Sequence, residues 1–168
     1  MKLLIDANVI LDVLQNRPGF VEDSSLVWKL CETNEAVGYV SALTYANLIY
    51  IMRKELSPEK IEEVYKTLRL IFEFVDLSVS DLSHAVEMQW KDFEDAVQSA
   101  TAERLHVDYI ITRNVRDFNK SKVLALTPSE LLAAFNHFHK QTRQVSWRVC
   151  LYPHVFYILS HFFCKINA

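Results

Sequence analysis

The chain has 168 residues, 51% of them hydrophobic, so it is long enough to form one domain with a substantial core. Two glycines and four prolines favour a helix-rich domain with short connections and argue against a β-sandwich or a barrel. Every acidic residue lies within positions 1–130. This acidic character disfavours non-specific binding along duplex nucleic acid, so any contact with nucleic acid should be local.

The two ends of the chain and its cysteines indicate which kinds of protein this chain is not. The N-terminal run MKLLIDAN breaks at Asp6 and lacks a small-residue cleavage site, which argues against a signal peptide and favours a cytoplasmic protein. The three cysteines are widely spaced without a CxxC motif, so neither a disulfide framework nor a zinc ribbon is expected. Arg148 and Pro153 interrupt the apolar tail, which makes it a poor membrane span.

Hydrophobic periodicity and turn signals predict strands that alternate with helices. The predicted strands are residues 2–5, 37–41, 74–77, 109–112 and 123–126. The predicted helices are residues 9–14, 21–33, 43–54, 58–72, 80–90 and 92–105, and a last one from 128. Their expected N-terminal signals are Ser57 before Pro58, Ser80, Asp92, and the capping box from Thr127 to Glu130. Leu26, Val27 and Leu30 should form one apolar stripe.

This alternation predicts an α/β fold of three layers, α/β/α, with a short central parallel sheet. Right-handed crossovers favour a central first strand, with the first and fourth strands flanking the point where the winding direction reverses. Asp6 should then face the turn of Thr112, Arg113 and Asn114. In the helix from Asp92, we expect Asp92, Asp95 and Ser99 on one face and Phe93, Val97 and Ala100 in the core.

The polar residues gathered at these strand ends carry oxygen ligands only. Carboxylates crowded into one crevice repel one another unless a cation lies between them, and a set without His or Cys selects Mg²⁺ or Mn²⁺. A phosphoryl-transfer reaction on a substrate phosphate is the chemistry that such a site favours. Asn47, just beyond the second strand, and Asp117, after the fourth, are further candidates.

At these residues the chain resembles the PIN domain, the nuclease fold of toxins of the virulence-associated protein C type. The matching segments are IDANVILD, YVSALTYANLIYIMRK, DFEDAVQSATA, DYIITRNVRDF and LTPSELL, in the family's order and spacing. The resemblance covers residues 1–135 and implies a metal-dependent endoribonuclease of single-stranded RNA. It further implies an antitoxin partner and a homodimer.

The expected site follows from the residues and the resemblance together. The catalytic candidates are Asp6, Asp95, Asn47, Asn114 and Asp117, and the metal candidates are Asp6, Asp95, Asp92 and Asp117. Many family members have an acid where this chain has Asn47, and aspartate where it has Asn114. Supporting residues are expected at Asn8, Thr112 and Ser41. The basic residues beside the site are expected to bind RNA, and they are Arg113, Arg116, Lys120 and Lys122.

Several of these residues also have a purely structural interpretation. Asp95 alone would suit the first turn of any helix, whereas Asp6 at the end of a buried strand is costly to bury without a partner. Asn47 is equally compatible with the site and with a hydrogen bond at the helix start. Thr112 is equally compatible with a strand position. Asp12 could be a fifth acid of the site or an exposed helix residue, and the exposed helix residue is the expectation.

The stretch 136–168 is outside this pattern and is expected to be an extension that follows a nuclease domain of residues 1–135. A zinc site among its histidines and cysteines is the weaker interpretation, because their spacing matches no usual site. Two other function classes remain open. One is a PIN domain that binds RNA or protein without cleaving it. The other is a phosphohydrolase or receiver-like domain with Asp6 as nucleophile, which Asn8 disfavours because such domains carry a second aspartate there.

Overall fold

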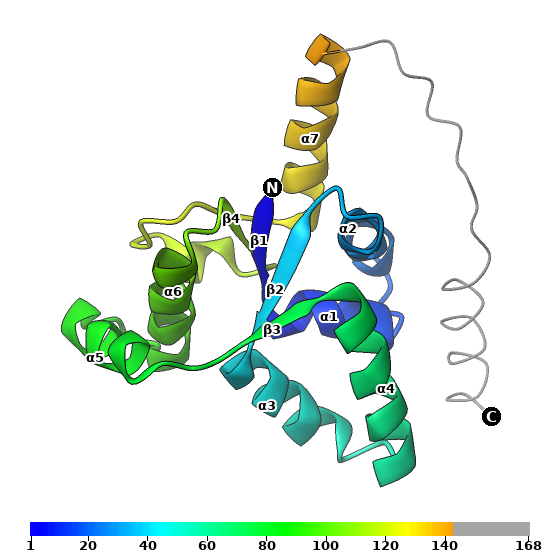
Figure 1. Ribbon diagram of the computed structural model, residues 1–168, viewed down its shortest axis with the longest axis horizontal. Coiled ribbons are helices and arrows are strands. Elements are labelled where there is room, and N and C mark those ends of the chain that lie inside the picture. The colour runs from blue at the N-terminus through cyan, green and yellow to red at the C-terminus, as the bar shows by residue number, and fades with distance from the viewer. Residues whose placement is uncertain (143–168) are drawn as a thin grey trace.

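In the computed structural model, residues 1–142 are described, with side chains up to residue 135, and they form a three-layer α/β/α domain. A five-stranded parallel sheet lies in the middle, in the order β3–β2–β1–β4–β5 (Figure 1). Its strands are β1 (Lys2–Ile5), β2 (Val37–Ser41), β3 (Glu73–Val75), β4 (Tyr109–Ile111) and β5 (Ala125–Leu126). The predicted fold class is therefore confirmed, with β1 central as expected.

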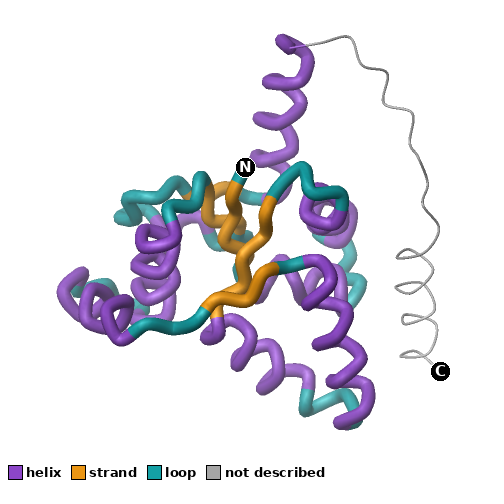
Figure 2. Tube along the Cα trace, viewed as in Figure 1, coloured by secondary structure: helices purple, strands orange, loops and turns teal. Residues whose placement is uncertain are grey.

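The helices lie on both faces of this sheet (Figure 2). They are α1 (Ala7–Leu14), α2 (Val21–Glu32), α3 (Ala42–Met52), α4 (Pro58–Ile71), α5 (Val79–Met88), α6 (Phe93–Leu105) and α7 (Pro128–Thr142), with a 3₁₀ helix η1 (Val115–Phe118). No helix in the described part of the chain is long and apolar enough to cross a membrane. The expected boundary at residue 135 falls inside α7, and the candidate zinc ligands of the tail lie outside the described side chains.

The central strand is buried on both faces, as parallel strands usually are. Leu3, Leu4 and Ile5 are all fully buried, and their side chains alternate between the two layers. Leu3 and Ile5 pack in the core under α1, α2, α3, α4 and α7, while Leu4 packs on the other face with Ala102 of α6. The apolar run at the N-terminus therefore fixes β1 in the middle of the domain, and Asp6 follows directly at its end.

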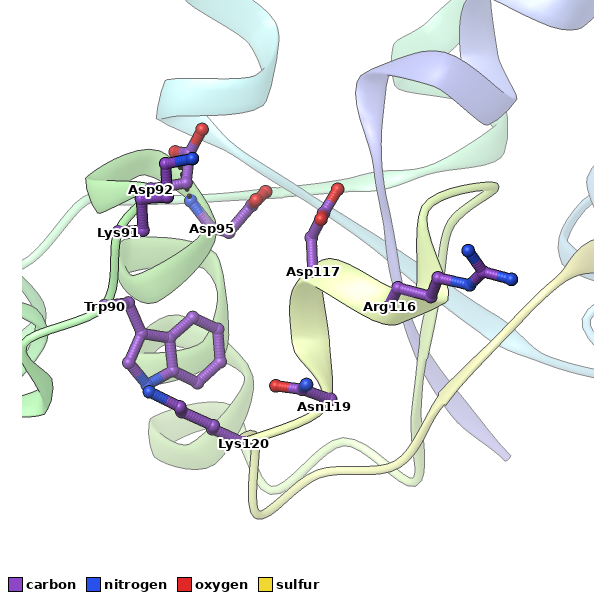
Figure 3. A pocket seen from close by; sticks show the side chains of 8 residues that line it. All are labelled: Trp90, Lys91, Asp92, Asp95, Arg116, Asp117, Asn119 and Lys120. Atoms are coloured by element: carbon purple, nitrogen blue, oxygen red, sulfur yellow. Dashed lines mark hydrogen bonds between the residues drawn. The ribbon is translucent and has the colours of Figure 1, made fainter.

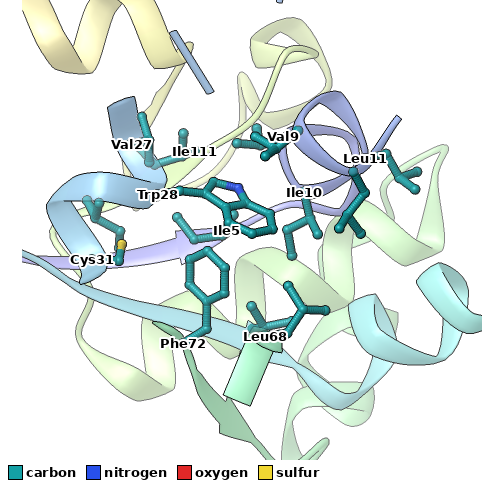
Figure 4. Packing of buried hydrophobic residues seen from close by; sticks show 14 of the residues in the cluster. Ile5, Val9, Ile10, Leu11, Val27, Trp28, Cys31, Leu68, Phe72 and Ile111 are labelled. Atoms are coloured by element: carbon teal, nitrogen blue, oxygen red, sulfur yellow. The ribbon is translucent and has the colours of Figure 1, made fainter. Parts of the chain in front are cut away.

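The larger core shows how tightly β2 and α2 approach (Figure 4). Trp28 of α2 meets Phe72 edge to face, with ring centroids 5.2 Å apart. A Cβ atom on Gly38 of β2 would lie 2.7 Å from both Cys31 Sγ and Phe72 Cδ1, so only glycine fits there. Burial raises the pKa of the Cys31 thiol to about 12, so this cysteine is a packing residue.

Helix starts follow local chemistry, with one correction. Ser57 Oγ accepts the N–H of Lys60 at the start of α4, and Thr127 and Glu130 form the expected reciprocal cap of α7. The N-cap of α5 is Ser78 and not Ser80, because Asp81 lies at the third helical position and completes a capping box with Ser78. The third strand correspondingly spans Glu73–Val75 instead of the predicted 74–77.

Two predicted core positions are wrong. Leu26 is 50% exposed, while its neighbours Val27 and Leu30 are buried as expected. Phe93 is 49% exposed, whereas Val97 and Ala100 are buried. Phe93 is the first residue of α6, and helical periodicity alone overestimates burial at the end of a helix.

Candidate active site

Asp6 occupies the end of β1, next to β4. Its N–H donates to the carbonyl of Ile111 at 3.0 Å, which extends the β1–β4 ladder by one residue. Its side chain is only 8% exposed and does not cap α1, although Asp6 is the N-cap residue. Burial raises the pKa of Asp6, against the lowering effect of its hydrogen bond with Thr112. The carboxylate is therefore buried at the strand ends without the usual N-cap hydrogen bond to α1.

Asn8 and Thr112 hold this carboxylate in place. Thr112 Oγ1 donates to Asp6 Oδ2 at 2.7 Å, and Asn8 Nδ2 donates to the same oxygen at 2.6 Å. Asn8 Oδ1 accepts the backbone N–H of Arg113 at 3.2 Å, and Thr112 Oγ1 accepts that of Asn114 at 3.0 Å. The contact expected between Asn8 and Asp6 is present. Both side chains fix Asp6 and the loop after β4 as one hydrogen-bonded unit.

Asp95 lies in the first turn of α6, where other acids surround it. Burial raises its pKa to about 7, reinforced by the charges of Asp92, Asp6, Asp117 and Glu94. These acids come from the end of β1, the start of α6 and η1, so three separate parts of the chain converge here. Asp92 also has a structural task, because its Oδ1 accepts the N–H groups of Glu94 and Asp95 as the N-cap.

Asn47 and Glu94 form a pair that the sequence analysis missed. Asn47 lies in the second turn of α3, and its amide Nδ2 donates to Glu94 Oε1. Burial, then the charges of Asp6 and Asp92, raise the pKa of Glu94, while the bond from Asn47 lowers it. The letters FED at a helix start were the available signal, but they do not reveal which acid meets a residue on another helix. The carboxylate of Glu94 therefore lies beside Asn47, the position where this chain has an amide.

Gln98 is a second residue that the sequence analysis missed. It lies on α6 one turn beyond Asp95, is 2% exposed, and donates from Nε2 to Asp6 Oδ1 at 3.5 Å. Its Oε1 is buried with no hydrogen-bond partner in the structure. A buried unpaired amide oxygen is costly, and it makes a ready acceptor or ligand for a group that enters the site.

The remaining predicted residues divide into helix caps and site residues. Asn114 is exposed and begins η1, where its carbonyl accepts the N–H of Asp117. Asp117 is exposed and lies beside Asp95 (Figure 3). Ser41 is fully buried and is the N-cap of α3. Its hydroxyl accepts the N–H of Thr44 and donates to Thr44 Oγ1, so both of its hydrogen bonds lie at the start of the helix. Ser99, expected on the face of Asp95, is buried and donates to Ser121.

A cavity of about 410 Å³ opens beside these acids. Its acidic lining comes from Asp92, Asp95 and Asp117, and the rest is Trp90, Lys91, Arg116, Asn119 and Lys120 (Figure 3). Of the four predicted RNA-binding residues, Arg116 and Lys120 line this cavity. Lys122 pairs with Glu103 at 2.9 Å, and Arg113 pairs with Asp12 at 3.1 Å, so both are engaged in the fold.

Asp12 is not the exposed helix residue that its position on α1 suggested. It is fully buried, accepts a hydrogen bond from Ser24 Oγ at 3.1 Å, and faces the guanidinium groups of Arg17 and Arg113. The Arg113 guanidinium also lies 4.5 Å from the centre of the Phe20 ring. The expectation failed because the partner that permits burial comes from the distant loop after β4. Asp12 ties that loop to α1.

The donor set fits a hard divalent cation. Its groups are carboxylate and amide oxygens, without sulfur or imidazole, which are the ligands of Mg²⁺ and Mn²⁺. In the described residues, no three His, Cys, Asp or Glu side chains are already gathered closely enough to hold an ion. The repulsion that adds to burial in raising the pKa of Asp95, and the unpaired Gln98 Oε1, are both features that a bound cation would relieve.

Comparison with known proteins is consistent with this geometry. Residues 2–116 match the family model of the PIN domain. A search of curated proteins gives no significant match. The resemblance noted from the sequence segments is thereby confirmed, and a receiver-like domain with Asp6 as nucleophile is excluded in favour of this family.

Solved structures share the same fold at low sequence identity. VapBC2 from Rickettsia felis, bound to a DNA fragment from its promoter, gives a TM-score of 0.62 at 15% identity over 76% of this chain and 98% of that one. VapBC-1 from nontypeable Haemophilus influenzae gives 0.61 at 19% identity over 77% and 99%. VapC20 from Mycobacterium tuberculosis, a sarcin-ricin loop cleaving toxin, gives 0.51 at 10% identity over 64% and 86%.

Proposed function

Because the chain belongs to the PIN domain family, we propose that it is a metal-dependent endoribonuclease that hydrolyses phosphodiester bonds in single-stranded RNA. The observation that carries the proposal is the convergence of acids from β1, α6 and η1 around Asp95, whose pKa burial raises to about 7 with a further contribution from these neighbouring charges. Perturbed carboxylates beside an open cavity are typical of catalytic sites.

In this proposal Asp6 and Asp95 hold Mg²⁺ or Mn²⁺, with Asp92 and Asp117 contributing negative charge beside them. When bound, such an ion neutralises charge on the phosphate oxygens and activates a water for attack. Asn8 and Thr112 keep the Asp6 carboxylate oriented through the hydrogen bonds described above. Gln98 holds its other oxygen, and its own unpaired Oε1 is placed to accept a hydrogen bond from a water in the site.

Arg116 and Lys120 guide the RNA backbone. Both are exposed and line the cavity beside the acids. Their charges offset the repulsion between an acidic site and an incoming phosphate chain, and such contacts position RNA without reading its sequence. Arg113 acts instead through its ion pair with Asp12, which holds the loop that carries Thr112 and Asn114.

We further propose that the protein is the toxin of a toxin–antitoxin pair, bound by a cognate antitoxin and acting in the cytoplasm as a homodimer. The support is the fold shared with solved VapBC complexes. A second candidate function is RNA or protein binding without cleavage. It is favoured by the amides at Asn47 and Asn114, where many family members carry acids.

The test of the ribonuclease proposal is cleavage of a labelled single-stranded RNA by the purified chain under four conditions. We expect cleavage with Mg²⁺ or Mn²⁺, none without added metal, and none in excess chelator. Undiminished cleavage in excess chelator would overturn the metal-dependent mechanism. Tight RNA binding without cleavage under every metal condition would establish the second candidate instead.

The Asn47–Glu94 pair gives a prediction on metal affinity. Glu94→Gln should weaken Mn²⁺ binding about tenfold. The substitution removes one negative charge that interacts with Asp6 and Asp92 beside the proposed ion. Asn47→Asp should tighten Mn²⁺ binding, because a second carboxylate then faces the ion beside Glu94. Calorimetric titration with Mn²⁺ measures both. The matched control is Glu22→Gln, an exposed acid on α2. Affinities equal to that of the control in both variants would remove the pair from the site.

A further inference from the structure

The cavity beside the acids has two chemically different parts. Asp92, Asp95 and Asp117 lie at one end, and the indole of Trp90 and the amide of Asn119 face each other at the other end (Figure 3). A site that only held a metal ion would need neither an aromatic ring nor 410 Å³ of space. This volume lies within the range of small-molecule sites and suits a single nucleotide.

We propose that this cavity binds the nucleotide next to the cleaved phosphate, with its unpaired base stacked on Trp90 and its edge hydrogen-bonded by Asn119. The inference rests on the proposed ribonuclease function for the position of the cleaved bond. Base stacking on an aromatic side chain contributes about 1–3 kcal/mol and suits any base, because every base has a π face. Bases inside a duplex are already stacked, so the cavity selects single-stranded RNA.

Trp90 is held in a fixed orientation for this role. It lies between α5 and α6, half-buried, and meets the Phe118 ring of η1 edge to face at 6.3 Å. Phe118 is itself buried, so the indole is anchored on one side while its other side contributes to the cavity wall. A preordered aromatic surface loses little side-chain entropy when a base stacks on it.

Two basic residues beside the cavity are available to contact RNA phosphates. Lys122 and Arg113 already form ion pairs within the fold, with Glu103 and Asp12 respectively. In the described part of the chain, neither Arg116 nor Lys120 has an acidic group within ion-pair distance, and both line the cavity. They can therefore neutralise phosphates of a strand bound in the cavity, while the acids hold the cation at the cleaved phosphate.

The experiment measures binding of fluorescein-labelled single-stranded RNA to the full chain in excess chelator, so that no strand is cleaved. Trp90→Leu should weaken binding about tenfold, because the flat ring is lost while an apolar side chain still covers Phe118. Trp90→Phe should retain most of the affinity. The control pair is Lys120→Ala against Arg69→Ala, an exposed arginine of α4. Only Lys120→Ala should weaken binding.

Two readouts separate stacking from a packing role of Trp90. RNA should quench tryptophan emission of the wild-type chain but not of Trp90→Phe. One abasic site at the bound position should weaken binding of the oligonucleotide to the wild-type chain. The same abasic site should cause no further loss of affinity in Trp90→Leu, as a double-mutant cycle requires when both changes remove one shared contact. Wild-type affinity in Trp90→Leu, or an additive abasic loss, would overturn the proposal.

The two proposals can fail separately. If cleavage depends on metal but neither its rate nor RNA affinity responds to Trp90 or to abasic sites, the ribonuclease proposal stands and the base-binding proposal fails. Base-dependent binding through Trp90 without cleavage under any metal condition would keep the cavity and remove the ribonuclease.

Discussion

Replacing Asp95 with asparagine should lower RNA cleavage by more than about a hundredfold. Loss of a residue that merely orients a metal ligand costs 10–100-fold, and Asp95 is placed to be a ligand itself. Its carboxylate is the one on which the charges of Asp92, Asp6, Asp117 and Glu94 all act. Single-turnover cleavage at saturating Mg²⁺ measures this effect.

The same substitution should stabilise the metal-free protein at neutral pH. The folded-state pKa of Asp95 is about 7 and its ordinary value is 3.8, so the folded chain retains this proton while the unfolded chain has lost it. The contribution of Asp95 to stability therefore falls as the pH rises from about 4 to about 7, and it is constant above that range. Asp95→Asn has no carboxyl group to titrate, so it removes this loss of stability at neutral pH.

Urea unfolding in chelator at pH 4 and pH 8 checks the sign. We expect Asp95→Asn and the wild type to agree at pH 4 and the variant to be more stable at pH 8. Added Mg²⁺ should stabilise the wild type more than the variant, because the ion offsets the same repulsion. A variant that is inactive and also less stable at pH 8 would show that Asp95 is a structural residue. A pH-independent difference would contradict the charge cluster.

Asp12→Ala should lower the free energy of unfolding by about 2–4 kcal/mol. Breaking a buried ion pair by removal of one partner costs about 3–5 kcal/mol. The cost is at the lower end here, because Arg17 and Arg113 are 30% and 26% exposed and can turn towards water. Urea unfolding measures this effect, and Glu32→Ala, an exposed acid of α2, is the control.

Asp12→Ala should also slow cleavage beyond what lost stability explains. Arg113 is held by Asp12, and its backbone N–H donates to Asn8 Oδ1, which in turn supports Asp6. At a temperature where the variant is fully folded, kcat should fall with little change in KM, because the disturbed residues orient the reacting groups. Full activity in a destabilised variant would confine Asp12 to a structural role.

The sequence predicted those features that local chemistry determines. The run Leu3–Ile5 ends at Asp6 in a buried strand, and the caps at Ser57 and Thr127 are specified within four residues of each helix start. Strand alternation with helices was enough to place β1 beside β4, and hence Asp6 beside Thr112. The proximity of Asp6 and Thr112 therefore follows from the sequence pattern alone.

The errors within the candidate site concern contacts between distant segments. Nothing near Asp12 on α1 announces Arg113 as its partner, so a buried charge was interpreted as an exposed one. Asn47 was recognised as a departure, but its hydrogen bond with Glu94 joins two helices whose relative placement only the fold determines. Gln98 was missed for the same reason, because a glutamine within a helix gives no sign that a strand end lies against it.

The most direct test of the central claim is the position of Mn²⁺ in a crystal of the full chain grown with the ion. Anomalous scattering identifies manganese independently of any model of the site. We expect one strong peak between the carboxylates of Asp6 and Asp95, and its loss in Asp95→Asn. A peak bound elsewhere, with the Asp6–Asp95 site empty in a protein that cleaves RNA, would contradict it.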